Sequence, residues 1–398
     1  MIDFDSALEV AIGLVGLLDD EEVSLDQSRG RILAEPVRAA HDQPPTRRSK
    51  MDGIAVADAA PQRGQRFRLV GEAPAGTAAA VTLGTGQAIK IATGGVVPEG
   101  AKRVVPRELL DDGEGEVSVI ETPSGPDFIR PVGADFRSGD ALLPAGTLLD
   151  AGAIALAAAA NEAMLRVRRR PSIGVLTGGD ELVPVGSPVT PTSAIDSVGP
   201  MLAALIEDWG GEPCRLPLLP DDPQAVERSI AQAIGQYDLL LVAGGASVGE
   251  RDFVRGAVTA LGGTLGFERI AMKPGKPCWC ACLGETPLLG LPGNPGSAFV
   301  GAHLLLRPMM ARMLGIAAPQ WQDARYEGET VETGSRQTFL LSRIEEHADG
   351  RAASALSLQD SGAQSALAAC DALVNVAAGS TLSNGQTARI LRVRGWGR

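Results

Sequence analysis

The chain has 398 residues, and at about 150 residues per domain this length predicts two to three domains. Hydrophobic residues make up 44% of the chain, enough for buried cores, which excludes a disordered or fibrous protein. The formal net charge is −12. That charge disfavours a general nucleic-acid-binding protein, because such proteins neutralise phosphates with a basic surface.

The histidines, cysteines and apolar runs of the sequence further limit the class of protein and the kinds of site that we expect. The three histidines, His41, His303 and His347, are far apart in the sequence, which disfavours a histidine-based zinc or iron site. No apolar run reaches the roughly 18 residues of a membrane span, and the acidic N-terminus lacks a signal-peptide pattern. Five cysteines, an odd number, fit a reducing compartment. We therefore expect a soluble, cytoplasmic protein that binds neither membranes nor nucleic acids.

The first 170 residues change character twice. Apolar residues of the first segment recur at helical steps and predict an amphipathic helical pattern within residues 1–38, namely Leu8, Ile12, Val15 and Leu18. Residues 39–135 carry short apolar runs between glycines and prolines, which is typical of a small β-rich module. The alanine-rich residues 150–163 again predict a helix. We expect the two helical segments to pack together, so that the β-rich module is an insertion.

Strands and helices alternate along residues 171–315. The predicted strands are 173–176, 239–242 and 288–291, and the predicted helices are 198–209, 222–235, 253–261 and 297–314. This alternation favours a mostly parallel sheet covered on both faces, in which a ligand sits beyond the carboxyl ends of the strands. Short predicted strands at 338–344, 372–376 and 388–393 then indicate a small terminal β domain.

A glycine-rich loop, residues 243–252, follows the apolar strand 239–242 and precedes a helix. Its glycines let the backbone approach an anion closely, and the N–H groups at the helix start favour negative charge. The loop matches neither a dinucleotide-binding nor a Walker pattern. Asp252 lies near the helix start, where it is either a helix cap or a functional carboxylate.

Two further loops carry turn residues. In residues 272–277, Lys273 and Lys276 are held by two prolines and a glycine, and a rigid turn with two cations suits an oxyanion or a phosphate. A solvated charged turn is the alternative, but it would not require such rigidity. Residues 290–297 join a strand to a helix, and a turn capped by Ser297 explains this loop without any chemistry.

Carboxylates occur where two strands are expected to end. Asp180 and Glu181 follow the strand 173–176, and Asp221 and Asp222 follow another apolar run. Carboxylates at such places hold Mg²⁺, which also keeps waters and bridges to ligand oxygens. Helix capping is the alternative, especially for Asp222, which precedes Pro223.

The remaining motifs favour structural interpretations when they are taken alone. Residues 49–55 and 91–95 are typical of hairpin turns in the β-rich module. Cys278, Cys280 and Cys282 alternate, so a strand would point all three thiols to one face. Small buried residues explain this pattern better than a metal site does, because no other soft ligands accompany them.

Six motifs occur in a definite order, and together they resemble the MoeA family of molybdopterin molybdenumtransferases, which is related to the E domain of gephyrin. They are Met51-Asp52-Gly53, Thr93-Gly94-Gly95, Gly179-Asp180-Glu181-Leu182, Gly244-Gly245-Ala246-Ser247-Val248-Gly249 with Asp252, Met272-Lys273-Pro274-Gly275-Lys276-Pro277 and Leu291-Pro292-Gly293-Asn294-Pro295. Each motif alone is weak, but their joint order is specific. The resemblance extends from about residue 1 to the C-terminus.

The resemblance implies a four-part, multidomain α/β plus β subunit. Its parts would be an elongated helical or mixed domain (1–45 and 135–170), an inserted β-rich domain (46–134), a three-layer α/β domain of the molybdopterin-binding (MoCF) type with a mostly parallel sheet (171–316) and a small C-terminal β-barrel domain (317–398). It also implies a homodimer whose active cleft lies between the α/β domain of one subunit and the inserted domain of the other.

The implied reaction is insertion of molybdate into adenylylated molybdopterin, with release of AMP and dependence on Mg²⁺. The implied catalytic residues are Asp52, Thr93, Glu181, Asp221, Asp252, Lys273 and Lys276, of which Glu181, Asp221 and Asp252 would hold the metal. The implied binding residues are Gly244, Gly245, Ser247, Gly249, Pro292, Gly293, Asn294, Pro295, Arg336, Ser361 and Ser365. Contacts with a molybdopterin adenylyltransferase or with recipient molybdoenzymes are also implied.

Three positions depart from the family pattern. Ile54 replaces a tyrosine, Gly178 replaces a residue with a hydroxyl, and Val198 replaces an asparagine. These changes leave open a diverged paralogue that carries or chaperones the cofactor without efficient metal insertion. A third hypothesis is adenylylation of molybdopterin by the α/β domain, which the inserted β-rich module disfavours.

Overall fold

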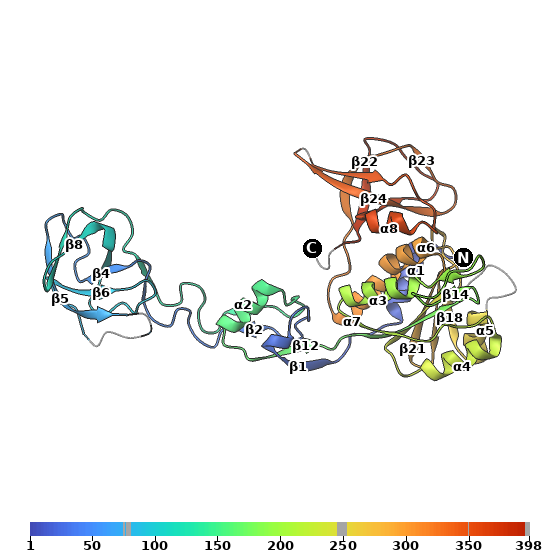
Figure 1. The fold of residues 1–398 in the computed structure, drawn as a ribbon, viewed down its shortest axis with the longest axis horizontal. Coiled ribbons are helices and arrows are strands. Elements are labelled where there is room, and N and C mark those ends of the chain that lie inside the picture. The colour runs from blue at the N-terminus through green and yellow to red at the C-terminus, as the bar shows by residue number, and fades with distance from the viewer. Residues whose placement is uncertain (75, 77–80, 245–252, 349, 395–398) are drawn as a thin grey trace.

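A computed structural model of the chain describes residues 1–74, 76, 81–244, 253–348 and 350–394. The molecule is elongated, with a β module at one end, a small unit in the middle, and an α/β domain packed against a β-barrel at the other end (Figure 1). No helix among the described residues is both long enough and apolar enough to cross a membrane.

The α/β domain is built on one sheet of six strands. Their order is β16 (Glu212–Arg215), β13 (Ser172–Gly178), β17 (Leu239–Gly244), β21 (Thr286–Leu291), β20 (Trp279–Leu283) and β18 (Thr264–Phe267). The first four strands run parallel; β13, β17 and β21 were predicted, and β16 was not. The sequence pattern also missed β20 and β18, of which β20 pairs antiparallel with β21 and β18 pairs antiparallel with β20. The mostly parallel sheet is therefore mixed at one edge.

Helices cover both faces of this sheet, which makes three layers. One face carries α1 (Phe4–Gly13), α3 (Val198–Asp208), α6 (Pro295–Gly301) and α7 (Arg307–Leu314), and the other carries α4 (Pro223–Ala233) and α5 (Phe253–Ala260). On β17, Leu239 and Leu241 face the first helix layer while Leu240 and Val242 face the second. This alternation is the period of two of a strand that is buried on both faces.

The first helix packs in a different domain from the one that we expected. We expected residues 1–38 to form a helical part of the elongated domain, but α1 ends at Gly13 and packs in the core of the α/β domain. Its buried face is Phe4, Ala7 and Ala11, whereas Leu8 and Ile12 are only partly buried. The predicted stripe is therefore only partly right: Val15 is buried in this core and Leu8 and Leu18 pack against it, but the most buried residues of α1 are Phe4, Ala7 and Ala11.

The middle unit is mainly strands. β1 (Asp20–Ser24) pairs with β12 (Met164–Arg168), and β2 (Val37–Arg38) pairs with β11 (Ala141–Leu143). A short 3₁₀ turn (Leu25–Gln27) and the predicted alanine-rich helix, α2 (Ala151–Ala159), cover them. The Asp150 side chain accepts a hydrogen bond from Ala153 N at 3.0 Å and so caps α2.

The β module lies farthest from the rest of the chain (Figure 1). Its six-stranded sheet has the order β7 (Arg103–Pro106), β4 (Gly53–Val56), β6 (Gln87–Ile91), β5 (Arg66–Ala73), β9 (Glu116–Val119) and β8 (Leu110–Asp112). A 3₁₀ turn (Arg107–Leu109) joins β7 to β8. A two-stranded ribbon, β3 (Arg48–Ser49) with β10 (Ile129–Arg130), connects the module to the middle unit.

The C-terminal strands close into a small barrel, as predicted. They are β22 (Gln322–Glu327), β24 (Gln337–His347), β25 (Gly350–Ala355), β26 (Ala372–Val376) and β28 (Thr387–Arg392), and closure comes from the pairing of β24 with β26. Two elements flank the barrel. One is the short strand pair of β23 (Val331–Glu332) and β27 (Thr381–Leu382), and the other is α8 (Gln364–Ala369). Barrel residues Phe339, Leu341 and Leu373 share one core with the α/β domain.

The helix predicted over 297–314 is longer and not uniform. It begins at Pro295, becomes π-helical over Ala302–Leu306 and continues as α7. The expected cap by Ser297 is wrong: Ser297 lies inside α6 and is buried, and Asn294 takes the cap position. Pro295 suits the first helical position because that residue has no intrahelical N–H partner.

Candidate functional site

Three loops meet at the carboxyl edge of the parallel strands, where a ligand site is expected. They follow β13, β17 and β21. A β-carbon on Gly244 would collide with the carbonyl oxygen of Gly178, and one on Gly293 would lie 3.2 Å from the α-carbon of Gly244. Gly244 also has a φ of +90°, which favours glycine. These glycines therefore let the three loops pack backbone against backbone.

The acidic loops of this edge are tied to one another. Asp180 Oδ1 accepts a hydrogen bond from Asp221 N at 2.9 Å, and Gly178 bridges to Leu219. This linkage brings the turn that carries Glu181 next to the loop that carries Asp221. Asp222 is a helix cap, the alternative that we considered to a metal ligand: its carboxylate accepts a hydrogen bond from Ala225 N at 2.6 Å and caps α4.

A buried carboxylate behind this edge was not recognised from the sequence. Asp196 is 1% exposed, and its oxygens accept from Gly199 N at 2.9 Å, Arg215 Nη2 at 3.1 Å and Thr177 Oγ1 at 3.2 Å. It thereby joins the end of β13, the start of α3 and the end of β16. The short parallel pair β14 (Leu182–Val183) and β15 (Ala194–Ile195) runs from the Glu181 turn to Asp196.

The lysine turn lies where the α/β domain meets the barrel. β19 (Met272–Lys273) pairs with the start of β24, which places Lys273 opposite Thr338. Arg336 is therefore next to this turn. Lys273 is exposed and Lys276 is half-buried, and among the described residues neither lysine forms an ion pair. Both cations are available to an anion.

The barrel also contacts the loop after β21. Asn294 Nδ2 donates to Ser361 Oγ at 3.1 Å, and Gly296 N donates to the Ser361 carbonyl oxygen at 2.7 Å. Gln364 Nε2 donates to Ser197 Oγ at 2.7 Å, which places the α8 segment containing Ser365 beside the start of α3. Pro292 and Pro295 flank the Asn294 turn. The predicted barrel residues and the predicted strand-end residues therefore lie at one boundary.

The β module carries two of the predicted residues, Asp52 and Thr93. Thr93 N donates to Asp52 Oδ1 at 2.6 Å. Hydrogen bonds from the Thr93 backbone and side chain, with the nearby Arg107 charge, hold the pKa of Asp52 below its usual range. The carboxylate lies at the rim of a cavity of about 410 Å³ that Lys90 and Arg107 also line. Asp52 is thus an ionised, exposed carboxylate.

One chain does not bring all predicted residues together. Asp52 and Thr93 lie in the module at one end of the molecule, whereas the lysine turn and the acidic loops lie at the other end (Figure 1). Four further predicted positions, Gly245, Ser247, Gly249 and Asp252, lie outside the described residues.

The donor set at the edge fits Mg²⁺ in its chemistry. Within the described part of the chain, no three His, Cys, Asp or Glu side chains are grouped to hold a metal. Mg²⁺, however, is usually bound by one or two carboxylates together with substrate phosphates, and does not need a closed protein cage. Glu181 and Asp221 supply oxygen donors of this kind at the carboxyl edge of the sheet, the edge at which the lysine turn also leads into β20 beside the end of β21.

The cysteines do not form a metal site in the described structure. Cys278 and Cys280 are buried on one face of the sheet, with Trp279 and Ala281 in the opposite core. Burial raises the pKa of Cys278, and raises that of Cys280 to about 12. Both thiols are therefore protonated, and the interpretation of these residues as small and buried is confirmed for this pair.

Comparison with known proteins identifies the chain's relatives. Residues 2–161 match the MoeA N-terminal region (domains I and II), and residues 174–312 match a probable molybdopterin binding domain. The molybdopterin molybdenumtransferase of Nostoc is 34% identical over 81% of this chain and 76% of its own length. That of Bacillus subtilis is 29% identical over 94% of this chain and 90% of its own length.

The solved structures agree with these relatives. A crystal structure of a MoeA protein from Pyrococcus horikoshii superposes with a TM-score of 0.84 at 28% identity, covering 100% of both chains. A second structure from that organism superposes with a TM-score of 0.81 and shows the same fold at 24% identity. The agreement extends over all parts of the molecule and not only over the α/β domain. The chain therefore belongs to the MoeA family of molybdenum cofactor biosynthesis proteins.

Proposed function

We propose that this protein inserts molybdate into adenylylated molybdopterin and releases AMP, with Mg²⁺ as the metal ion. The observation that carries the proposal is the boundary between the α/β domain and the barrel. The turn of Lys273 and Lys276 pairs with the barrel beside Arg336, and it leads into β20 at the carboxyl edge of the sheet. The loops that carry Glu181 and Asp221 lie at this same edge. Molybdate and phosphate are both oxyanions, so the same cations can stabilise either.

The lysines and the carboxylates of this edge have different proposed roles. The lysines would hold oxyanion oxygens, and the carboxylates would hold Mg²⁺, which would neutralise charge on the phosphoanhydride that is cleaved. Water would cleave this bond, leaving AMP and a molybdopterin phosphate. The pterin dithiolene supplies the sulfur ligands of molybdenum, which agrees with a protein whose core thiols, Cys278 and Cys280, are buried and protonated.

We also propose that the site is completed by a second copy of the chain. Asp52 and Thr93 are exposed residues of the β module, which lies at the opposite end of the chain from the α/β domain that carries Lys273 and Asp221 (Figure 1). A homodimer that places the β module of one subunit against the α/β domain of the other would bring both sets of residues to one cleft. Isologous dimers of this kind contain two equivalent sites.

The test is a reconstituted reaction. Purified full-length protein receives adenylylated molybdopterin, molybdate and Mg²⁺, and AMP release is measured together with activation of an apo-molybdoenzyme. We expect both products with the wild type, and a loss of both with Lys273→Ala. Lys102→Ala, in the β module, is the matched control and should stay active. Tight pterin binding without either product would overturn this proposal and favour the hypothesis that the protein is a carrier or chaperone of the cofactor.

A further inference from the structure

A basic pocket lies beside Asp52 and Thr93, at the ribbon that joins the β module to the middle unit. It consists of two adjoining cavities of about 530 Å³ and 300 Å³, both lined by Gln43, Pro44, Lys50 and Arg130. Arg48 lines the smaller cavity together with Thr93 and Gly94. We define this basic pocket by Arg48, Lys50 and Arg130.

The strand register places like charges directly opposite one another. In the ribbon of β3 and β10, Arg48 pairs with Arg130. Side chains directly opposite across an antiparallel pair share one face, and like charges in such positions destabilise the pair. Lys50 is two residues after Arg48, and its backbone N–H continues the pairing by donating to Phe128 O at 2.9 Å. Three cations are thus gathered on one face.

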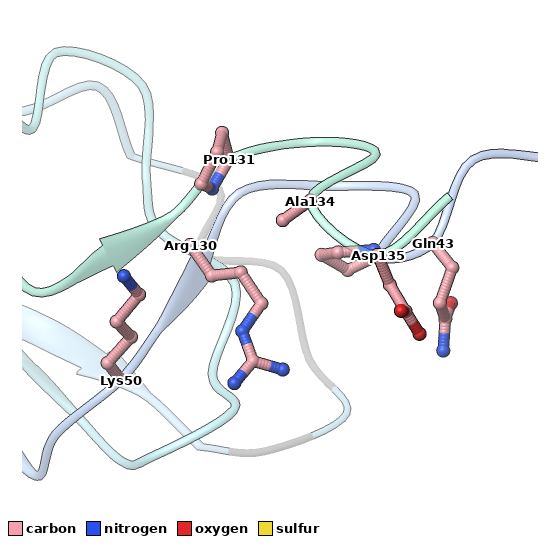
Figure 2. Close-up of a pocket in the computed structure, with 7 residues that line it drawn as sticks. Gln43, Lys50, Arg130, Pro131, Ala134 and Asp135 are labelled. Carbon is pink, nitrogen blue, oxygen red and sulfur yellow. The ribbon is translucent and has the colours of Figure 1, made fainter. Parts of the chain in front are cut away.

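These cations have little anionic compensation within the protein. Among the described residues, none of Arg48, Lys50 and Arg130 forms an ion pair with a carboxylate. Arg48 Nη1 donates to the Gly94 carbonyl oxygen at 3.1 Å, which orients its guanidinium toward the Thr93 loop. Figure 2 shows the Arg130 guanidinium extending between Lys50 on one side and Asp135 and Gln43 on the other. Asp135 is the one carboxylate that lines these cavities.

We propose that the basic pocket binds a phosphoryl group, as a phosphate monoester or a phosphoanhydride. Arginine forks match the oxygens of phosphate in a bidentate way, and a bound dianion would remove the repulsion between Arg48 and Arg130. The local charge is +3 with one opposing carboxylate, in a chain of net charge −12. This inference rests on the proposed function, for which it places a phosphate of the nucleotide-bearing substrate beside Asp52 and Thr93.

The experiment is titration calorimetry of the full-length protein with AMP, with adenosine as the uncharged probe and molybdate as a competing oxyanion. We expect AMP to bind, adenosine to bind at least about tenfold more weakly, and added salt to weaken AMP binding. Lys50→Gln and Arg130→Gln should each weaken AMP binding about tenfold or more. Lys50→Arg should restore most of it, because it keeps the cation.

Arg63→Gln is the matched control, since it removes one exposed cation of the same module outside both cavities. Removing one charge of the facing arginine pair should not lower the melting temperature, so a loss of AMP binding with an unchanged melt separates recognition from folding. Unchanged AMP binding in both glutamine variants would overturn the subsite. So would a wild type that binds molybdate more tightly than AMP.

The outcome is distinguishable from that of the proposed function. If the wild type releases no AMP from adenylylated molybdopterin but the variants lose AMP binding, the reaction fails and the subsite stands. If AMP release occurs and the variants bind AMP as the wild type does, the subsite alone fails.

Discussion

At the scale of single residues, buried polar groups determine how the ligand edge is held. Asp196 is almost inaccessible, and its carboxylate accepts hydrogen bonds from three different segments of the chain. Sequence patterns do not reveal this, because the same Asp-Ser dipeptide is common in surface turns. Only the fold shows that Thr177 and Arg215 converge on it.

We predict that Asp196→Ala lowers the free energy of unfolding by about 3 kcal/mol, because it leaves buried donors without their acceptor. Urea unfolding followed by circular dichroism measures this loss. Asp222→Ala is the matched control: it removes an exposed helix cap and should cost only about 1 kcal/mol. Equal losses in the two variants would contradict the buried role of Asp196.

His303 predicts a pH effect on stability. The residue is fully buried between Trp209 and Phe299, and within the described structure neither ring nitrogen has a hydrogen-bond partner. Burial, and secondarily the positive Arg307, lower its pKa to about 3. Below about pH 6.5 this histidine is protonated in the unfolded chain but stays neutral in the folded chain. The free energy of unfolding therefore falls as the pH drops from about 6.5 to about 3.

We expect His303→Leu to remove this part of the acid sensitivity. Between about pH 7 and about pH 5 the variant should lose about 2 kcal/mol less stability than the wild type does. Denaturant unfolding at both pH values measures the difference. His347→Leu, at an exposed position in β24, serves as the control and should follow the wild type. If His303→Leu and the wild type lost the same stability between these pH values, His303 would not be the cause of the acid sensitivity.

Asp52 gives a prediction on activity. Its pKa is held below the usual value by hydrogen bonds from Thr93, with Arg107 adding to the effect, so its carboxylate stays charged as the pH falls to about 4. We predict that Asp52→Asn lowers the rate of AMP release by roughly 100-fold while the melting temperature changes little, because the side chain is exposed. The wild-type rate should show no acid limb from this group above about pH 4. An active Asp52→Asn variant would exclude Asp52 from the reaction.

At the scale of elements, close backbone packing fixes the loops of the ligand edge. Gly244 ends β17 in the left-handed region of φ, directly against the carbonyl of Gly178. A β-carbon there meets backbone, which cannot move aside as a flexible side chain can. The glycine-rich pattern after an apolar strand indicated such an approach, but not which backbone atoms would meet.

We predict that Gly244→Ala destabilises the protein by roughly 2–4 kcal/mol and abolishes AMP release, because the β13 and β17 loops must separate. Gly256→Ala is the control, since a β-carbon at that position in α5 meets no atom within 4 Å. It should stabilise the helix by about 0.5–1 kcal/mol. Thermal melts of both variants test the contrast, and a Gly244→Ala variant as stable as the wild type would contradict it.

At the scale of the whole molecule, the two halves of the proposed site lie at opposite ends of one chain (Figure 1). The β module has its own cores, as does the middle unit, whereas the α/β domain and the barrel share one core. The module can therefore serve as an arm whose function depends on where a second subunit meets it.

Mixed dimers test this arrangement. We predict that Asp52→Asn and Lys273→Ala proteins are each inactive alone, and that unfolding and refolding them together restores activity. Random mixing makes half of the dimers mixed, with one complete site of two, so about a quarter of the wild-type AMP release should return. The same molar mixture without refolding is the control. No recovery in refolded mixtures that contain mixed dimers would refute a site shared between subunits.

The sequence by itself determined the local features of this protein. Strand and helix alternation predicted the α/β domain and both of its helix layers, because burial of a parallel sheet imposes continuous apolar strands. Glycine, proline and lysine spacing located the loops at Gly244, Lys273 and Asn294, because turn chemistry is local. The ordered motifs also identified the family.

Only the tertiary structure decided which elements meet. The two antiparallel edge strands, the docking of α1 on the α/β domain, the pairing of β19 with the barrel and the burial of Asp196 all depend on contacts between distant segments. Such contacts leave no periodic signal in a sequence, since β-strand pairing and core packing are chosen by shape and burial. The separation of Asp52 from Lys273 arises in the same way, because it follows from the length and direction of the middle unit.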